Sequence, residues 1–326
     1  MKRPFILLAL GFIFTSLAFA EDTPAPKPVR PQMSIAQALD IHLDLPYAGN
    51  DNPRQALDLF LPTKRATDKP LPVIVYIHGG GWSGGSRKGG GPVSRYVATG
   101  NYAGVSVGYR LSSEVKWPAQ IHDCKAAVRW IRGHAKEYNL DPDRIGVTGM
   151  SAGGHLVSLL GLTGDVKDLD GSIGEFTALS SRVTCVVNFF GPTDMASPLM
   201  QGDAALKDDP AVAGLLGGSL KEKAAEAKAA SPLTYVHAGA PPFMTVHGTK
   251  DMRVNFTNAT MLHEALTKAG SPSILLPITD AGHGGFTSSE LDHRVQQFYD
   301  RHLRGIPAEI ATGAITPDPR PEPAKK

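Results

Sequence analysis

A serine flanked by small residues stands between a strand-like and a helix-like part of the sequence. Residues 149–153 read GMSAG, so that Ser151 follows the short apolar run 145–147. Leucines then recur at helical spacing over residues 156–160. A G-x-S-x-G turn between a strand and a helix predicts a nucleophile elbow, which exposes a serine Oγ for attack on a carbonyl carbon. Because the chain contains 35 glycines, the motif needs support from the rest of the sequence.

The small residues around Ser151 have a physical role in such a turn. Strand and helix pass so close together that we expect a Cβ at Gly149 or Gly153 to clash. The backbone N–H of Ala152 would lie at the start of the helix, where partial positive charge favours an oxyanion. The local sequence therefore predicts both a nucleophile and one donor for the charge that develops during attack.

A nucleophilic serine also needs a base and an acid that orients the base. In hydrolases with a wound parallel sheet, these residues follow one another along the chain in the order Ser, acid, His. Asp251 lies just after the strand-like segment 243–246. His283 lies between glycines in the loop after the last strand-like segment, 273–278. Both positions belong to the carboxyl edge of a parallel sheet. We therefore predict His283 as the base and Asp251 as its acid.

Two other acidic residues compete with Asp251 for this role. Asp280 is so near His283 in sequence that the two side chains cannot easily face each other. Glu264 falls in the middle of a predicted helix. Asp251 remains the preferred acid.

The sequence HGGGW at residues 78–82 follows the β-branched run 73–77. Successive glycine N–H groups can point into one small space, so we expect Gly80 and Gly81 to form an oxyanion hole with Ala152. A phosphate loop would need GxxxxGK[ST], which the sequence lacks. Trp82 either forms a wall of the substrate pocket or packs beside the loop. The candidates for substrate binding are Trp82, Asp194 and Phe286.

Strand-like and helix-like segments alternate from residue 73 to residue 304, which predicts an α/β fold with a mostly parallel central sheet and helices on both faces. Segments 41–45 and 56–61 alternate polar with apolar residues and are expected as half-exposed antiparallel edge strands at the N-terminus. Residues 195–232 are rich in Ala and Lys and predict a small helical cap. The predicted organisation is a signal peptide (1–20), a flexible leader (21–40), one domain (41–304, with the cap insertion 195–232) and a disordered tail (305–326).

The first twenty residues have the composition of a secretory signal peptide. A basic start precedes an apolar run of about a dozen residues, and Ala18-Phe19-Ala20 fits a cleavage site. We expect cleavage after Ala20, a secreted or periplasmic protein and no membrane anchor after processing. Export would permit a disulfide, but buried free thiols are favoured for Cys124 and Cys185.

The chain has 326 residues and a formal net charge of +2. A net charge so close to zero gives no reason to expect a nucleic acid partner. The sequence gives no indication of the oligomeric state. The candidate site needs neither a metal nor a cofactor.

Six motifs in order carry a resemblance to a known family: HGGGW, GYRL at 108–111, GMSAGG, GPTD, HGTKD and GHGGF. Over residues 41–304 the chain resembles the α/β-hydrolase fold, and within it the secreted HGGG-type carboxylesterases. It is similar to the acetyl-xylan and feruloyl esterase group and to hormone-sensitive-lipase relatives. The resemblance implies a metal-free serine esterase whose triad is Ser151, Asp251 and His283. Gly108 departs from the family, which usually has an acid there, and Asn255 stands where the family often has proline.

Three functions compete at this point. The first is a serine esterase for short acyl groups on a small-molecule or carbohydrate ester, with acylated plant polysaccharide as a candidate substrate. The second is an amidase, exopeptidase or formamidase that uses the same triad, although a peptidase would usually carry a large extra domain that gates its site. The third is a binding protein with a relic site, which the complete triad disfavours.

Overall fold

The computed structural model of the chain describes residues 34–88, 90–196 and 209–319. The predicted signal peptide and leader residues 21–33 lie outside the described residues. Eight strands form one sheet in the order β1-β2-β4-β3-β5-β6-β7-β8. Their bounds are β1 Leu39–Pro46, β2 Ala56–Pro62, β3 Leu71–Ile77, β4 Ala103–Val107, β5 Leu140–Met150, β6 Cys185–Phe189, β7 Phe243–Gly248 and β8 Ser273–Ile278. Only β2 runs against its neighbours, and the pairs from β4 to β8 are parallel.

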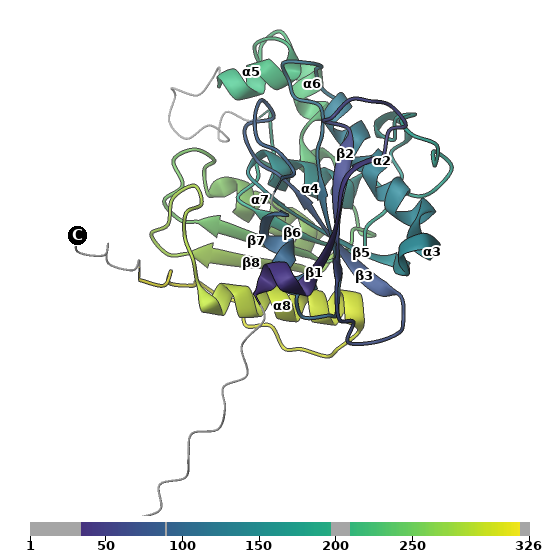
Figure 1. Cartoon of the computed structure of the whole chain (residues 1–326). Helices are drawn as coiled ribbons and strands as arrows, with labels where there is room; N and C mark the ends of the chain where they lie inside the picture. The colour runs from purple at the N-terminus through teal and green to yellow at the C-terminus, as the bar shows by residue number, and fades with distance from the viewer. Residues whose placement is uncertain (1–33, 89, 197–208, 320–326) are drawn as a thin grey trace, which may run out of the picture. The chain divides into compact units, whose positions relative to one another are not determined.

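The central strands are apolar on both sides because helices cover both faces of the sheet. The helices are α1 Ser94–Val97, α2 Ala119–Gly133, α3 Ala135–Tyr138, α4 Ala152–Leu162, α5 Pro210–Leu216, α6 Ala224–Ala229, α7 Thr257–Lys268 and α8 Ser289–Arg304. One core cluster joins the sheet to α2, α4 and α7. The other joins it to α1 and α8. Figure 1 shows α8 along the lower face and α5 and α6 on the opposite side. The mostly parallel sheet with covering helices agrees with the fold predicted from the sequence.

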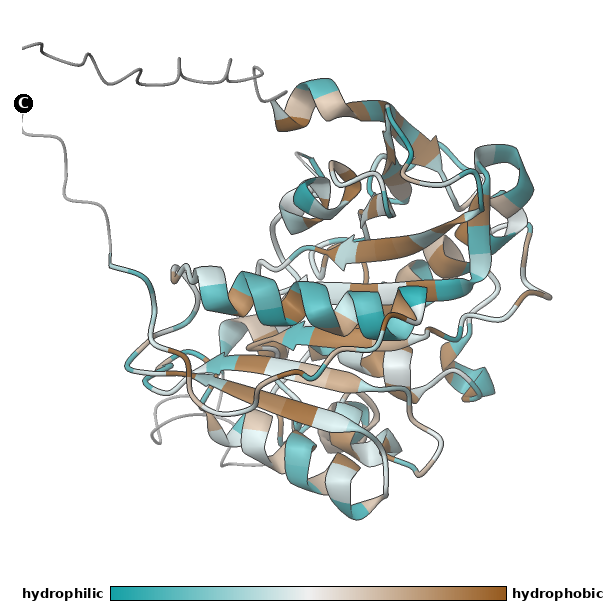
Figure 2. Cartoon of the chain, turned by 90° about the horizontal axis from the view of Figure 1, so that it is seen from below, coloured by the Kyte–Doolittle hydropathy of each residue, from teal (hydrophilic) through white to brown (hydrophobic). Residues whose placement is uncertain are grey.

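Helix α8 illustrates how the sequence sets these layers. The Ser288 hydroxyl caps it by accepting from the N–H of Leu291, and Gly305 ends it in a left-handed conformation. Its apolar side chains face the sheet, while its outer surface is mostly hydrophilic (Figure 2). The helix therefore covers the sheet face opposite α4.

The prediction that both N-terminal strands are half-exposed edge strands is wrong for β2. Strand β1 is the edge, whereas every residue of β2 is buried. The polar residue that suggested exposure, Asp58, is buried and accepts hydrogen bonds from Arg87 Nε and from the backbone N–H of Asp44. Because a charged residue with such partners can be buried, a polar residue in the alternating sequence pattern does not always mark an exposed position.

Both predicted ends of the domain also need correction. Residues 35–38 form a 3-10 helix capped by Ser34, and β1 begins at Leu39, inside the predicted leader. In the predicted disordered tail, Ile310 and Ile315 are buried against the α8 side of the sheet. The N–H of Ile315 donates to Pro277 and its carbonyl accepts from Thr279, so residues up to 319 continue the domain beside β8.

We expect the tail to contribute measurably to stability. Ile315 is fully buried, so Ile315→Ala would leave a cavity and lower the free energy of unfolding by about 2–5 kcal/mol. Urea unfolding followed by circular dichroism measures this change. Ile306→Ala is the matched control, because Ile306 is 41% exposed and its truncation should matter by less than about 0.5 kcal/mol. Equal stability of the two variants would show that the tail packing is dispensable.

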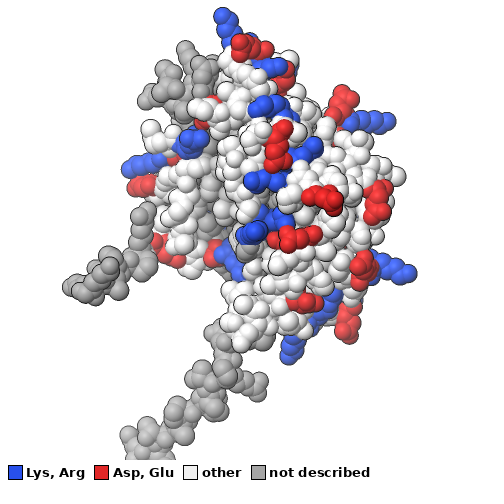
Figure 3. All heavy atoms as spheres, turned by 45° about the horizontal axis from the view of Figure 1, so that its top comes forward, with Lys and Arg blue, Asp and Glu red and all other residues white. Residues whose placement is uncertain are grey.

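Three further features bear on the sequence predictions. Cys124 and Cys185 are buried free thiols, which confirms the favoured interpretation. Within the described part of the chain, no helix combines the length and apolar character needed to cross a membrane. On the face shown in Figure 3, basic and acidic side chains are interspersed.

Candidate active site

The backbone at Ser151 has the strained form that a nucleophile elbow requires. Ser151 has φ 55° and ψ −119°, directly between the end of β5 and the first residue of α4. A Cβ added to Gly149 would lie 2.4 Å from the carbonyl oxygen of Gly153, and one added to Gly153 would lie 2.1 Å from that of Ile77. Both flanking glycines are therefore required by the close approach of strand and helix, as the sequence predicted.

We expect Gly153→Ala to be one of the more damaging single-methyl additions to this chain. The new Cβ meets backbone of the central strand β3, which cannot move aside as a side chain could. A loss of about 3 kcal/mol or more in the free energy of unfolding is expected, measured by urea unfolding. Gly214→Ala in α5 is the control, since its Cβ would lie 3.7 Å from its nearest neighbour, Ser112 Oγ. That variant should be neutral or up to about 1 kcal/mol more stable.

The structure brings Ser151, His283 and Asp251 together at the carboxyl ends of β5, β8 and β7. The Ser151 hydroxyl lies 2.8 Å from His283 Nε2, and His283 Nδ1 lies 2.7 Å from Asp251 Oδ2. Because a carboxylate only accepts, Nδ1–H donates to Asp251 and Nε2 is left to accept the serine proton. The ring of Phe190 packs edge-on against the imidazole, with centroids 4.8 Å apart. The arrangement can move a proton from the hydroxyl to the imidazole.

Asp251 is buried, and donors lie within reach of both of its carboxylate oxygens. Its Oδ1 accepts from the backbone N–H groups of Arg253 and Val254 at 2.8 and 2.9 Å. Its Oδ2 lies 3.2 Å from the buried Nε2 of His247, in addition to His283. Burial raises the pKa of Asp251, but the hydrogen bonds from His247, His283 and Val254 outweigh burial and hold that pKa well below its usual value. The carboxylate is therefore ionised at neutral pH, where it accepts a hydrogen bond from His283 Nδ1–H. Sequence reasoning missed His247, whose place inside β7 is typical of a core residue.

The glycine loop, residues 78–82, turns back on itself after β3. Gly80 and Gly81 have φ values of 116° and 58°, and Trp82 has 55°. A Cβ at Gly80 would lie 2.5 Å from the carbonyl oxygen of Gly84, so this position also needs glycine. Gly81 and Ala152 line the same pocket as Ser151, whereas Gly80, the residue before Gly81, is not part of that lining.

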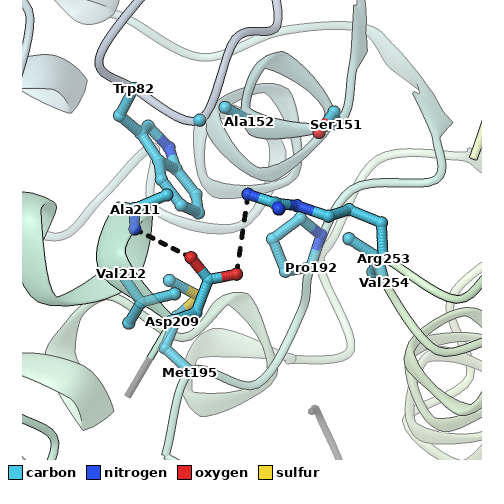
Figure 4. A pocket seen from close by; sticks show the side chains of 11 residues that line it. Trp82, Ser151, Ala152, Pro192, Met195, Asp209, Ala211, Val212, Arg253 and Val254 are labelled. Atoms are coloured by element: carbon cyan, nitrogen blue, oxygen red, sulfur yellow. Dashed lines mark hydrogen bonds and ion pairs between the residues drawn. The ribbon is translucent and has the colours of Figure 1, made fainter. Parts of the chain in front are cut away.

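A cavity of about 80 Å³ opens beside Ser151 (Figure 4). Trp82 forms one of its walls, and Met195, Val212 and Val254 add apolar surface. The other two substrate-binding candidates lie elsewhere. Asp194 is absent from this lining and accepts from the N–H of Ala196. Phe286 lines a separate cavity and lies 6.0 Å from the Phe190 ring.

Sequence reasoning missed the charged pair in the pocket. Arg253 reaches across the cavity toward Asp209, and Nη2 and Oδ2 are 3.6 Å apart (Figure 4). Asp209 also caps α5 by accepting from the N–H of Ala211 at 2.7 Å. An aspartate followed by proline is a recognisable helix start, but nothing in the sequence indicates that this helix faces the residue two positions after Asp251.

Among residues 34–88, 90–196 and 209–319, no group of three or more His, Cys, Asp or Glu side chains is placed to hold a metal ion. The described site consists of a serine, an imidazole, a carboxylate and backbone N–H groups. These are the parts of nucleophilic catalysis at a carbonyl group.

The chain is similar to known esterases. The BD-FAE family model matches residues 57–266. Esterase LipQ of Mycobacterium tuberculosis is 31% identical over 74% of this chain and 56% of its own length. The chain spans about half the length of such curated relatives.

Two solved structures are similar along most of their length. A truncated carbohydrate esterase from gut microbiota is 30% identical, with a TM-score of 0.75 over 81% of this chain and 96% of its own. A butyrate-bound esterase of Thermogutta terrifontis is 28% identical, with a TM-score of 0.62 over 80% of this chain and 90% of its own. The family match covers well over half of the sequence, and both structures share the sheet and its helices. The chain belongs to the BD-FAE family and has the α/β-hydrolase fold of esterases.

Proposed function

We propose that this protein is a serine hydrolase that cleaves carboxylic esters with short acyl groups through Ser151, His283 and Asp251. The observation that carries the proposal is the continuous pair of contacts from the Ser151 hydroxyl through the imidazole to the buried carboxylate, at 2.8 and 2.7 Å. The similarity to proteins named as esterases supports the same reaction.

The mechanism follows from the positions of these groups. His283 Nε2 takes the proton of Ser151 as Oγ attacks the ester carbonyl carbon, while Asp251 holds the imidazole in the required tautomer. The carbonyl oxygen becomes an oxyanion beside the N–H groups of Gly80, Gly81 and Ala152. The protonated imidazole then gives its proton to the departing alcohol. Water repeats the sequence on the acyl-enzyme and releases the carboxylic acid.

The size of the cavity supports the short acyl group. One water requires about 10–15 Å³ of such space, so a cavity of about 80 Å³ holds about five to eight water-sized groups. The similar Thermogutta terrifontis structure contains butyrate, a four-carbon acid. The carbohydrate esterase similarity supports an acylated polysaccharide as substrate. The signal-like residues 1–20 support a secreted or periplasmic location.

A substrate panel tests this proposal. The purified protein is assayed with p-nitrophenyl acetate, butyrate and octanoate, with acetylated xylan and a feruloyl ester, and with an anilide as the amide counterpart. We expect kcat/KM to be at least about tenfold higher for acetate or butyrate than for octanoate, because a longer chain exceeds the cavity. Faster cleavage of the anilide than of the esters would favour the amidase alternative. A fluorophosphonate probe that fails to label Ser151 would reject the serine hydrolase altogether.

A further inference from the structure

His155 lies one helical turn beyond Ser151 and is fully buried, yet it has no part in the triad. Its backbone N–H donates to the carbonyl of Ser151 at 3.0 Å. Its Nδ1 lies 3.2 Å from the indole Nε1 of Trp82, and its Nε2 lies 2.6 Å from the carbonyl oxygen of Ala230. One side chain thus connects the elbow, the glycine loop (residues 78–82) and the segment between α6 and β7.

The chemistry of these partners allows only one form of the ring. A carbonyl oxygen can only accept, so Nε2–H donates to Ala230. An indole N–H can only donate, so Nδ1 must offer a lone pair to Trp82. Burial lowers the pKa of His155 to about 4, although the hydrogen bond to Ala230 opposes this shift. His155 is therefore a neutral imidazole with a fixed tautomer at neutral pH, suited to a permanent structural contact.

Trp82 is a residue that needs such a contact. Its φ of 55° is unfavourable for a bulky side chain and persists only where the surroundings fix it. Its carbonyl accepts from the N–H of Ser112 at 2.8 Å. Its indole meets the imidazole of His155 edge-on, with centroids 5.2 Å apart. The main chain and the indole of Trp82 are thus held from two directions.

We infer that His155 is a positioning residue for the oxyanion hole, because its acceptor nitrogen holds the indole of Trp82 and thereby the adjacent peptide of Gly81. This inference rests on the proposed function. The N–H of Gly81 is one peptide unit from the Trp82 main chain. Because Trp82 has a strained φ of 55°, we expect its main chain to relax when the indole contact is lost, which would turn this donor away from the oxyanion. A misplacement of about 1 Å in a catalytic group can cost about 10²-fold in rate.

Two substitutions separate the two sides of the ring. In His155→Asn, the amide oxygen can take the place of Nδ1 and still accept from Trp82, while the donor to Ala230 is lost. In His155→Gln, the amide nitrogen can take the place of Nε2 and still donate to Ala230, while the acceptor for Trp82 is lost. We expect His155→Gln to lower kcat and kcat/KM for p-nitrophenyl acetate together by about 10²-fold, because an oxyanion donor acts mainly in the transition state. His155→Asn should lose less than about tenfold.

A spectroscopic measurement reads the contact itself. The chain has three tryptophans, so ¹⁵N-labelled indole gives three N–H signals, and Trp82→Phe identifies the one from Trp82. That signal should be shifted and slow to exchange in the wild type and in His155→Asn, but not in His155→Gln. Trp82→Phe already lacks the indole donor, so adding His155→Gln to it should cost little more activity.

Equal losses of kcat in the Gln and Asn variants, or an indole signal unchanged in His155→Gln, would overturn the positioning role and leave His155 as a packing residue. Fluorophosphonate labelling of Ser151 in the wild type tests the proposed function separately. A labelled, active wild type with a fully active His155→Gln variant rejects only the inference about His155. An unlabelled wild type rejects the proposed function.

Discussion

Ser151→Ala should lower kcat for p-nitrophenyl acetate by about 10⁵–10⁶-fold, the loss expected when the nucleophile of a triad is removed. The proposed acyl-enzyme forms on this hydroxyl, whose proton is taken by His283 Nε2, 2.8 Å away. Each factor of ten corresponds to about 1.4 kcal/mol of activation free energy, so the hydroxyl accounts for about 7–8 kcal/mol. The measurement is the initial rate at saturating substrate, with protein concentrations high enough to detect the residual reaction.

Ser158→Ala is the matched control for this change. Ser158 lies in α4, the helix that follows Ser151, and is fully buried. Its hydroxyl donates to the carbonyl of Gly154 at 2.8 Å, and it is not part of the lining of the cavity beside Ser151. We expect this variant to keep its activity within about twofold and to remain labelled by a fluorophosphonate. Turnover retained in Ser151→Ala would mean that another group attacks the ester, and the proposed mechanism would be wrong.

The sequence could predict the elements that carry Ser151, Asp251 and His283 because each of them follows a strand of one parallel sheet. The fold then determines that their loops meet at a single edge. The glycines at 149 and 153 were predictable for a similar reason, since a tight turn between strand and helix leaves no space for a Cβ. Local signals of this kind need only the neighbouring residues.

Other features depend on contacts between distant segments and leave no local signal. His155 follows the elbow in a helix pattern and resembles any buried helical residue until Trp82 and Ala230 are placed beside it. The proline-rich composition of the tail predicts disorder. Its isolated apolar residues at 310 and 315 show no periodicity, yet they pack beside β8 and α8. Burial of single residues in irregular segments is decided by tertiary packing.

Asp251→Asn should lower kcat by about 10³–10⁴-fold with little change in KM. The wild-type Oδ1 accepts two backbone N–H groups, from Arg253 and Val254, so the amide oxygen of asparagine must occupy that position. The amide NH₂ then faces His283 Nδ1, where the wild type offers an acceptor. Nδ1 becomes the acceptor, the proton moves to Nε2, and the imidazole can no longer take the proton of Ser151. Steady-state kinetics with p-nitrophenyl acetate measures the change.

The same substitution has a pH-dependent effect on stability. The pKa of Asp251 in the folded protein lies below the value of about 3.9 in an unfolded chain. The ionised carboxylate therefore stabilises the fold above about pH 4, and this contribution is lost as the pH falls through the folded-state pKa. We expect the difference in free energy of unfolding between wild type and Asp251→Asn to shrink as the pH is lowered below about 4.

Asp280→Asn is the control for the loss of an acid near the same loop. Asp280 pairs with Lys250 where both side chains are largely exposed, so its removal should change stability by less than about 1 kcal/mol. Its backbone φ of 56° suits asparagine as well as aspartate. Activity should stay within about twofold of the wild type. If Asp280→Asn proved as inactive as Asp251→Asn, or if Asp251→Asn kept its kcat, the orienting role would not belong to the carboxylate that the hydrogen bonds identify.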